Sequence, residues 1–328
     1  MLYLEFLEGQ GLGNQLWNYV TLRSISKKLG FGYKIINPEK FKGRKFLEIS
    51  YSENLVESNL KSYKKKNEIN NIFNEKLFYD SELKTFVSDF DENILKVNDN
   101  TLIRGLFQSE KYFFNHNINE FITLKKGFND SSKLQNHCLL NIRGGEYKRF
   151  KNLILPKTYW INAIKNMKRI NNELNFAIVT DDYNYASKLL PEIDILKGNM
   201  QHDFSRIFYA KYIIVSNSSF SYFPINLGEK PKDIIAPAHW ARFANTEDKW
   251  VSPANYYKKW NYQNELGIIL SEKEIKQSLK KTRKIYNSYF VLTTKDSVLR
   301  KTILFYIPTK LKKLIKKIFS KIFPLKIG

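Results

Sequence analysis

The second half of the chain alternates between short, mostly apolar runs and longer segments with helical spacing. Four apolar runs predict strands buried on both faces: residues 137–142, 176–180, 213–215 and 233–236. Between them, apolar positions at helical spacing predict helices: residues 156–170, 184–190, 203–210 and 222–227. A further short run at 193–196 adds one more strand. Strands and helices that alternate in this way form a parallel sheet with right-handed crossovers.

The first half opens with a similar pattern and then loses it. An alternating strand, a glycine-rich turn, a helix and a second strand are predicted in turn: residues 2–7, 9–15, 16–29 and 33–36. Residues 40 to 100 are rich in Asn and Lys and show no clear period, so we expect only short elements and loops there. Residues 102–107 predict one more strand, and a helix is expected to begin at Glu110.

Length and composition fit two domains or one large one. The chain has 328 residues, of which 43% are hydrophobic, enough for sizeable cores. A single cysteine, Cys138, excludes an internal disulfide and a cysteine-rich metal site, and the four histidines form no HxxxH or HExxH pattern. The N-terminus lacks the pattern of a signal peptide and no stretch is long enough to span a membrane, so we expect a cytoplasmic protein.

A net charge of +22 calls for an anionic partner, and its distribution narrows the choice. After Ser297 the chain carries nine Lys or Arg and no Asp or Glu. Residues 309–323 place apolar side chains at helical spacing with lysines between them, which is typical of a basic amphipathic helix on an anionic membrane surface. The alternative is a terminal helix packed on the protein's own core.

Small and polar residues follow three of the predicted strands: Asn141–Glu146, Thr180–Asp182 and Asn217–Ser221. The carboxyl ends of parallel strands meet at one edge of a sheet, and ligands of such sheets bind there. The sequence therefore predicts one ligand site to which all three segments contribute.

Two of these segments suit a phosphate group. Arg143 offers a guanidinium that can hold a diphosphate at two points. Asn217–Ser221 joins a strand to helix 222–227, and hydroxyls, free N–H groups and a helix dipole gather at such a junction. The structural alternatives are a surface arginine and an ordinary serine helix cap.

Three further segments are weaker candidates. Asp181-Asp182 suits a ribose, a base or a metal, or else caps the following helix. Gly9–Gly13 misses the spacing of a dinucleotide fingerprint, and Asn37 stands where a ribose-binding acid is expected, which argues against a nicotinamide enzyme. Asp89-Phe90-Asp91 has the DxD spacing of metal-dependent sugar transferases, or forms a solvated turn.

Four blocks resemble those of the bacterial α-1,2-fucosyltransferases of glycosyltransferase family 11 and, more distantly, those of the α-1,6- and protein O-fucosyltransferases. They are Gly11–Leu16 (GLGNQL), Gly105–Phe113 (GLFQSEKYF), Asn141–Tyr147 (NIRGGEY) and Asn217–Phe223 (NSSFSYF). They occur in the family's order. Lesser matches at 180–182 and 237–240 extend the resemblance over residues 9–240.

The resemblance implies an α/β, GT-B-like fold with two Rossmann-like domains facing across a cleft, followed here by the C-terminal basic amphipathic helix. The expected regions are an N-terminal acceptor-side domain (1–133), a GDP-sugar-binding domain (134–262) and a C-terminal helical region with the membrane-associating tail (263–328). The implied reaction is an inverting transfer, without cofactor or metal, from a GDP-sugar, usually GDP-fucose. The implied acceptor is a glycan hydroxyl, with α-1,2 linkage to galactose, in surface polysaccharide or lipopolysaccharide synthesis.

The resemblance also implies roles for single residues. The counterpart of Arg143 binds the β-phosphate of the donor, and Asp203 stands where related enzymes read the guanine. The chemistry of the reaction, and not the resemblance, suggests a carboxylate base, for which Glu146 is the candidate, with Asp182 in reserve. The catalytic set is Arg143, Glu146 and Asn14; the donor-binding set is Arg143, Asn141, Asp182, Asp203, Asn217, Ser218, Ser219 and Phe220; and the acceptor-side set is Gly13, Gln15 and Gln108.

Three positions depart from the family's pattern. Asn141 replaces a histidine, Gly144 replaces a second arginine, and Glu146 replaces an aspartate. Loss of one guanidinium weakens the hold on phosphate, and Lys148 or Arg149 is the expected compensation. These departures leave open another GDP-deoxysugar as donor, or binding of a GDP-sugar without turnover.

The expected partners follow from the resemblance and from the tail. They are a GDP-sugar, an oligosaccharide acceptor that is lipid-linked, and an anionic membrane at the inner face of the bacterial cytoplasmic membrane. A basic nucleic-acid-binding protein is the remaining alternative. It predicts basic residues interleaved with aromatic ones in a single module, and the sequence shows no such module.

Overall fold

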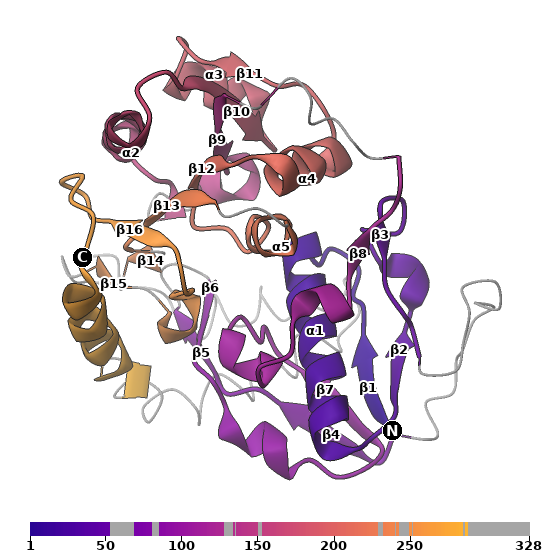
Figure 1. The fold of residues 1–328 in the computed structure, drawn as a ribbon. Helices are drawn as coiled ribbons and strands as arrows, with labels where there is room; N and C mark the ends of the chain where they lie inside the picture. The colour runs from indigo at the N-terminus through magenta and orange to yellow at the C-terminus, as the bar shows by residue number, and fades with distance from the viewer. Residues whose placement is uncertain are drawn as a thin grey trace, which may run out of the picture.

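Two parallel sheets, one in each half of the chain, define the architecture (Figure 1). The structure is a computed structural model. It describes residues 1–52, 69–80, 85–127, 134, 136–149, 153–228, 232–239, 241–242, 249–250, 252–284 and 286–287. The predicted α/β class and the GT-B-like pair of Rossmann-like domains are confirmed. The predicted tail helix at 309–323 lies outside the described residues.

The N-terminal domain is built on four parallel strands in the order β2-β1-β7-β4. Their bounds are Leu2–Glu5 (β1), Tyr33–Ile36 (β2), Asn71–Asn74 (β4) and Thr101–Arg104 (β7). Two small antiparallel pairs accompany them: β3 (Leu47–Glu48) with β8 (Thr123–Leu124), and β5 (Leu77–Asp80) with β6 (Thr85–Ser88). The described part of residues 40–100, where the sequence shows no clear period, therefore holds short strands, as expected.

The C-terminal domain is built on six parallel strands in the order β11-β10-β9-β12-β13-β16. Their bounds are Asp194–Ile195 (β11), Asn175–Thr180 (β10), His137–Ile142 (β9), Tyr212–Val215 (β12), Asp233–Pro237 (β13) and Asn261–Gln263 (β16). The helices are α2 (Lys157–Ile170), α3 (Tyr183–Leu189), α4 (Met200–Tyr209) and α5 (Tyr222–Leu227). A short pair, β14 (Ala241–Arg242) with β15 (Lys249–Trp250), lies beside the sheet. Every strand predicted in this half is present, and the sequence did not show β14, β15 and β16.

Helix α1 (Leu12–Leu29) packs on the N-terminal sheet, and its first turns lie next to α5 of the C-terminal domain (Figure 1). The Trp17 ring on this helix contacts rings from both halves of the chain. Its centroid lies 5.1 Å from that of Phe113, 4.2 Å from that of Tyr222 and 5.6 Å from that of Tyr257. These residues belong to one continuous apolar core, so burial of aromatic surface fixes one domain against the other.

Several predicted elements have the wrong bounds. Helix α4 begins at Met200 and not at residue 203, and strand β1 ends at Glu5 and not at residue 7. Helix α1 begins at Leu12, not at residue 16, so Gly13, Asn14 and Gln15 lie in its first turn and not in a glycine-rich loop. Strand β7 ends at Arg104, not at residue 107. The chain turns there because Phe107 adopts a φ of +50° and the N–H groups of Leu106 and Phe107 donate to the buried carboxylate of Glu75.

The chain returns to the N-terminal domain after β16. A helix covers residues 272–284, and the Arg283 side chain donates to Asp89 at 3.1 Å. Tyr286 donates to the carbonyl of Lys76 at 3.0 Å. Within the described part of the chain, no helix combines the length and apolar character needed to cross a membrane.

Candidate functional site

A cavity of about 540 Å³ lies where the two domains meet. Its walls come from the start of α1, the carboxyl ends of β9 and β10, the start of α4, and the loop between β12 and α5. Its volume falls in the ordinary range for small-molecule sites. Among the predicted site residues, the cavity is lined by Gly13, Asn14, Asn141, Arg143, Glu146, Asp203, Ser218, Ser219 and Phe220.

Arg143 stands at the end of β9 and is held from one side. Its Nη1 lies 2.9 Å from Oδ2 of Asp181, while Oδ1 of the same carboxylate accepts from the backbone N–H of Gly144 at 2.9 Å. The Nη2 lies 3.8 Å from Glu146, too far for a hydrogen bond. The buried Nε has no hydrogen-bond partner among the described residues. The guanidinium is therefore fixed in place but retains donors for an anion.

Asp181, and not Asp182, lines the cavity. The Asp182 carboxylate caps α3 by accepting from the backbone N–H of Tyr185 at 3.0 Å, and it forms an ion pair with Lys148. These contacts lower the pKa of Asp182 even though partial burial acts to raise it. The prediction of Asp182 as a donor-binding residue and reserve base therefore needs correction, because its oxygens serve the fold.

The missing second arginine has a packing explanation. A Cβ at Gly144 would lie 2.7 Å from Cβ of Asp182 and 2.8 Å from Cδ1 of Tyr185. Any side chain at this position would therefore push the start of α3 away from β9. Lys148 does not replace the lost guanidinium, because it is paired with Asp182 outside the cavity lining.

The start of α1 forms the opposite wall. Gly11 is the N-cap residue, and the first intrahelical bond runs from the N–H of Gln15 to the carbonyl of Gly11. The N–H groups of residues 12–14 precede that bond and, as in any helix, have no intrahelical acceptor. Both this positive helix end and Asn14 border the cavity.

Asn14 joins the two domains through its amide oxygen. Its Oδ1 accepts from Nε2 of Gln108 at 2.8 Å and from Oγ of Ser219 at 2.9 Å. With the oxygen engaged by donors from both domains, the Nδ2 amino group is the part of the amide left to face the cavity. Gln108 thus acts behind Asn14, and it does not itself line the cavity.

Gly13 permits the closest approach between the domains. A Cβ here would lie 2.6 Å from the backbone carbon of Ser219 and 2.8 Å from the backbone nitrogen of Phe220. Because those neighbours are backbone atoms, they cannot rotate aside as a side chain would. Glycine at this position therefore lets α1 lie directly on the loop between β12 and α5.

Gln15 and Asn217 lie behind the cavity wall. Gln15 is fully buried and bonds to the backbone of Lys40 and Lys42, so it fixes a neighbouring loop. Asn217 is buried and its Nδ2 donates to the carbonyl of Leu153 at 3.0 Å. The loop itself reaches the cavity through Ser218, Ser219 and Phe220, while Ser221 and the start of α5 do not line it. The start of α5, which the sequence predicted to face a phosphate, is set back from the cavity, and the loop before it lines the cavity instead.

Asp203 lies in the first turn of α4 and is 8% exposed. Burial raises its pKa to about 7, against the opposing effect of Arg206, whose Nη1 lies 3.5 Å from Oδ1. The capping residue Asn199 holds this helix start through bonds to the N–H groups of Gln201 and His202. A buried carboxyl at a cavity wall is suited to reading ligand N–H groups.

The DxD segment is engaged elsewhere. Asp89 pairs with Arg283, and Asp91 is buried and accepts from the N–H groups of Lys76 and Asn93. Within the described residues no group of three His, Cys, Asp or Glu is arranged to hold a metal ion.

Sequence reasoning missed several parts of the cavity, including Tyr183 at the start of α3 and Gly198 and Asn199 just before α4. Asp181 was grouped with Asp182 without a distinction between them, although only Asp181 faces the ligand edge. The helix start at Leu12 was missed because Gly11 and Gly13 suggested a turn. Lys42 lines the cavity from a segment in which no pattern was visible.

Comparisons with known proteins give one curated relative, and no protein-family model matches the chain. An α-1,2-colitosyltransferase of Escherichia coli is 29% identical over 45% of this chain and 60% of its own length. The chain thus matches less than two thirds of that relative.

Solved structures with a similar arrangement of elements are more distant. They include the α-1,6-fucosyltransferase NodZ soaked with GDP-fucose (12% identity, 69% of this chain and 92% of that chain, TM-score 0.41). POFUT1 in complex with GDP covers 71% of this chain and 97% of its own at 11% identity, with a TM-score of 0.46. The Escherichia coli heptosyltransferase WaaC with ADP matches 86% of this chain and 100% of its own chain at 10% identity, with a TM-score of 0.42. At these scores nothing about the ligand of this chain follows from them.

Proposed function

We propose that this protein is a glycosyltransferase that uses a GDP-sugar donor. The observation that carries the proposal is one cavity, between two Rossmann-like domains, that Arg143, Asp203 and the loop at Ser218 share with the start of α1. A cation, a buried carboxyl and a helix end around one space suit the phosphates, base and sugar of a nucleotide sugar. The colitosyltransferase relative supports the same class.

Arg143 acts on the leaving group. When the bond between the anomeric carbon and the β-phosphate oxygen breaks, negative charge builds on the departing GDP. A guanidinium already fixed by Asp181 stabilises that charge without reorganising. The orphaned Nε and the loosely placed Nη2 of this side chain are the donors that a phosphate satisfies. Transfer proceeds without a metal, because fixed protein groups supply the countercharge.

Asp203 reads the guanine. An ionised carboxylate accepts two hydrogen bonds from the N–H groups on one edge of guanine, whereas adenine presents a different pattern. With a pKa of about 7 in the free protein, this side chain is partly protonated near neutrality. Nucleotide binding therefore draws it toward the ionised form.

The acceptor attacks from the side of the N-terminal domain. Its hydroxyl oxygen forms the new bond to the anomeric carbon as the bond to phosphate breaks, with inversion of configuration. The proton of that hydroxyl passes to Glu146, whose side chain is 70% exposed beside Arg143. Asn14 orients the sugar through its free amino group.

The transferred sugar is fucose, joined in α-1,2 linkage to a galactose of a surface glycan. Another GDP-deoxysugar is the second candidate, favoured by the relative named for colitosyl transfer and by the changed residues Asn141, Gly144 and Glu146. The acceptor is carried on lipid at the inner face of the cytoplasmic membrane, where the basic segment 309–323 keeps the protein.

The nucleic-acid alternative receives less support. Single-strand binding uses exposed aromatic rings beside basic residues. Here Trp17, Tyr222, Tyr257 and Trp260 are buried between the domains.

The test is a transfer assay with the purified protein in EDTA. GDP-fucose, other GDP-sugars, a UDP-sugar and an ADP-sugar are offered with a β-galactoside, and both glycoside product and free nucleotide are measured by mass spectrometry. We expect consumption of a GDP-sugar with a new glycosidic bond. Use of UDP- or ADP-sugars alone would contradict the donor assignment, and donor hydrolysis without transfer would contradict the acceptor assignment.

A further inference from the structure

The loop that joins β16 to the helix at 272–284 exposes apolar side chains. Leu266 is 80% exposed, the highest value for any large hydrophobic residue in the described part of the chain, and Ile268 and Ile269 are 52% and 37% exposed. Ile170, at the end of α2, is a further 49% exposed. Single exposed apolar residues are common, but a contiguous set of them marks an interaction surface.

This exposure is built into the loop by its own hydrogen bonds. The side-chain oxygen of Asn264 accepts from the N–H groups of Leu266 and Ile268, each at 3.0 Å, and the N–H of Asn264 donates to the carbonyl of Ile268 at 2.9 Å. Gly267 has a φ of +83°, and its carbonyl accepts from Nδ2 of Asn166 on α2 at 2.7 Å. The loop is thus tied to α2 with its apolar side chains held outward.

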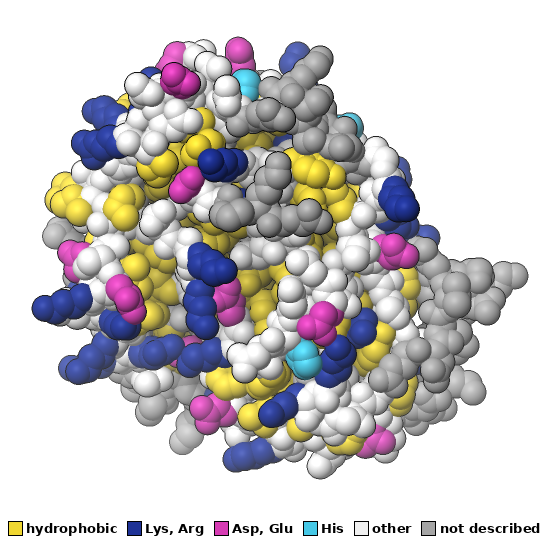
Figure 2. Space-filling view, viewed as in Figure 1, with side chains coloured by type: hydrophobic (Ala, Val, Ile, Leu, Met, Phe, Trp, Pro, Cys, Tyr) yellow, Lys and Arg dark blue, Asp and Glu magenta, His cyan; other side chains and the backbone are white. Residues whose placement is uncertain are grey.

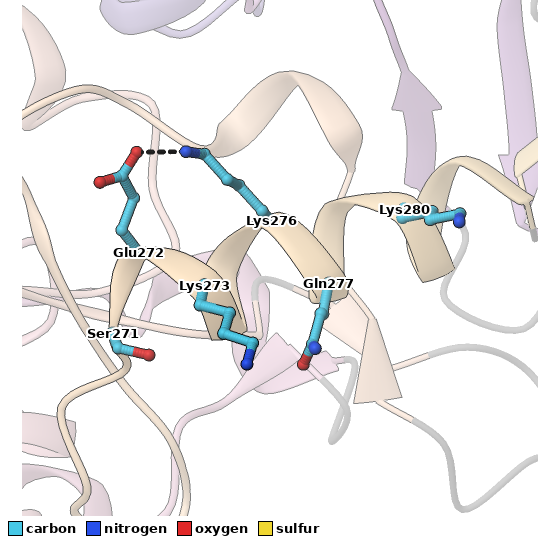
Figure 3. A pocket seen from close by; sticks show the side chains of 6 residues that line it. All are labelled: Ser271, Glu272, Lys273, Lys276, Gln277 and Lys280. Carbon is cyan, nitrogen blue, oxygen red and sulfur yellow. Dashed lines mark ion pairs between the residues drawn. The ribbon is translucent and has the colours of Figure 1, made fainter.

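Lysines flank this apolar tip on both sides. The helix at 272–284 exposes five of them along its length: Lys273, Lys276, Lys280, Lys281 and Lys284. Figure 3 shows Lys273, Lys276 and Lys280 on successive turns, with Lys276 paired to Glu272 at 2.5 Å. On the other side, α2 exposes Lys165, Lys168 and Arg169. In Figure 2 hydrophobic atoms at the left edge lie between groups of Lys and Arg above and below, with Asp and Glu side chains among them. Glu265, Glu272 and Glu274 are exposed on the same loop and helix, so the basic side chains outnumber the acidic ones on this face but do not stand alone.

We propose that this face, formed by the 264–270 loop with the exposed lysines of the 272–284 helix and of α2, docks on an anionic lipid bilayer. Leu266 and Ile268 enter the boundary between headgroups and acyl chains, and the lysines contact the anionic headgroups. This combination of an apolar projection and surrounding cations suits an interfacial membrane contact.

A bilayer fits this face better than a nucleic acid or a protein. Nucleic acids favour aromatic stacking, and the tip is aliphatic. A protein partner would need a groove matched to the tip, whereas a bilayer accepts any apolar projection. The chain also continues from this helix toward residues 309–323, whose basic amphipathic pattern suits the same surface. Stable association takes two such signals, and the folded tip supplies one that does not depend on the other.

The test uses the full chain and vesicle sedimentation. Wild-type protein is compared with a Leu266→Asp/Ile268→Asp variant on vesicles of phosphatidylglycerol mixed with phosphatidylcholine, and on phosphatidylcholine alone. Ile72→Asp/Leu95→Asp is the matched control, because those side chains are 51% and 38% exposed in the N-terminal domain. We expect binding to the anionic vesicles, an approximately tenfold or greater loss in the tip variant, and no loss in the control.

A Leu266→Trp variant reports on insertion itself. Relative to wild type, the added fluorescence should shift to shorter wavelength on anionic vesicles and be quenched by brominated lipids. Equal vesicle binding by the tip variant and wild type, an unquenched tryptophan, or binding to RNA in place of vesicles would each overturn the proposal. Both measurements are independent of transferase activity, so their failure is distinct from failure of the proposed function.

Discussion

The two walls of the cavity are built from different chemistry. The C-terminal wall carries ionisable side chains, with Arg143, Glu146, Asp181 and Asp203 among them. The N-terminal wall is mainly glycine, amide and backbone from the start of α1, with Lys42 as its one charged lining residue within the described part of the chain. Charge and close approach are thus supplied by separate domains.

This difference follows from what each wall must tolerate. Ionised side chains at the C-terminal wall need partners, and the Arg143–Asp181 pair meets that need before any ligand binds. The N-terminal wall has no room for a side chain at position 13, because a Cβ at Gly13 would lie against the backbone of Ser219. Under the proposed function, the C-terminal domain binds the nucleotide and the N-terminal domain places the sugar and the acceptor.

Removing the central cation should have the largest effect. Arg143→Ala should lower the rate of transfer by about 10²–10³, since one preorganised group facing developing charge is worth that much. Arg44→Ala, at an exposed arginine of the N-terminal domain, is the control and should transfer normally. Initial rates at saturating donor measure the effect. A change below threefold would contradict a role for Arg143 in the transfer step.

Replacing the buried carboxyl of Asp203 should weaken the binding of GDP and not that of ADP. Asp203→Asn loses charge-assisted bonds worth about 1.5–3 kcal/mol each, so GDP affinity should fall by about 10–10² while weak ADP binding stays unchanged. Calorimetry measures both, with Asp194→Asn at an exposed strand as the control. Equal losses for GDP and ADP would show that Asp203 does not read the base.

The same side chain should give binding a pH dependence. With a pKa of about 7 in the free protein, Asp203 gains its charge as pH rises, so GDP affinity should increase up to about pH 8 and then level off. Below pH 7 the slope approaches tenfold per pH unit at most. Titrations of wild type and Asp203→Asn between pH 5.5 and 8.5 test this, and parallel profiles for the two proteins would contradict it.

A change at the N-terminal wall should affect transfer and spare nucleotide binding. Asn14→Ala should reduce kcat about tenfold with GDP affinity unchanged, and Gln108→Ala should do the same more weakly by freeing the Asn14 oxygen. Asn184→Ala on the exposed side of α3 is the control. Kinetics measures kcat and calorimetry measures GDP affinity. A loss of GDP affinity that matches the loss of kcat would contradict the separate roles of the two walls.

The effect furthest from the cavity concerns stability in the N-terminal domain. Burial raises the pKa of Glu75 to about 7, so the folded state keeps a proton that the unfolded chain loses near pH 4.5. Stability should therefore fall as pH rises from about 5 to 7, by up to about 1.4 kcal/mol per pH unit from this group. Denaturant unfolding of Glu75→Gln should lack that component, and an unchanged pH profile would contradict the assignment.

The C-terminal domain could be predicted from sequence because its strands are buried on both faces. Runs such as 137–142 and 213–215 are mostly or wholly apolar, and the observed β9 and β12 match them to within one residue. The polar residues after those strands then identified the cavity edge. Long-range assembly was not needed for either inference.

The N-terminal domain resisted prediction because distant contacts shape it. Strand β4 has the sequence NIFN and is largely exposed, so it carries no apolar pattern. The turn after β7 depends on Glu75, thirty-two positions before Phe107, and a local pattern does not contain that partner. Asp181 and Asp182 likewise look alike in the sequence. Only the packing of α3 shows that Asp182 caps this helix while Asp181 lines the cavity.

The central claim is that Arg143 holds the terminal phosphate of a guanine nucleotide without a metal. The most direct measurement is the ratio of GDP to GMP affinity by calorimetry in EDTA, for wild type and Arg143→Ala. We predict that wild type binds GDP at least about tenfold more tightly than GMP and that the variant binds the two alike. A preference for GDP that survives in Arg143→Ala, or a wild-type protein that binds neither nucleotide, would contradict it.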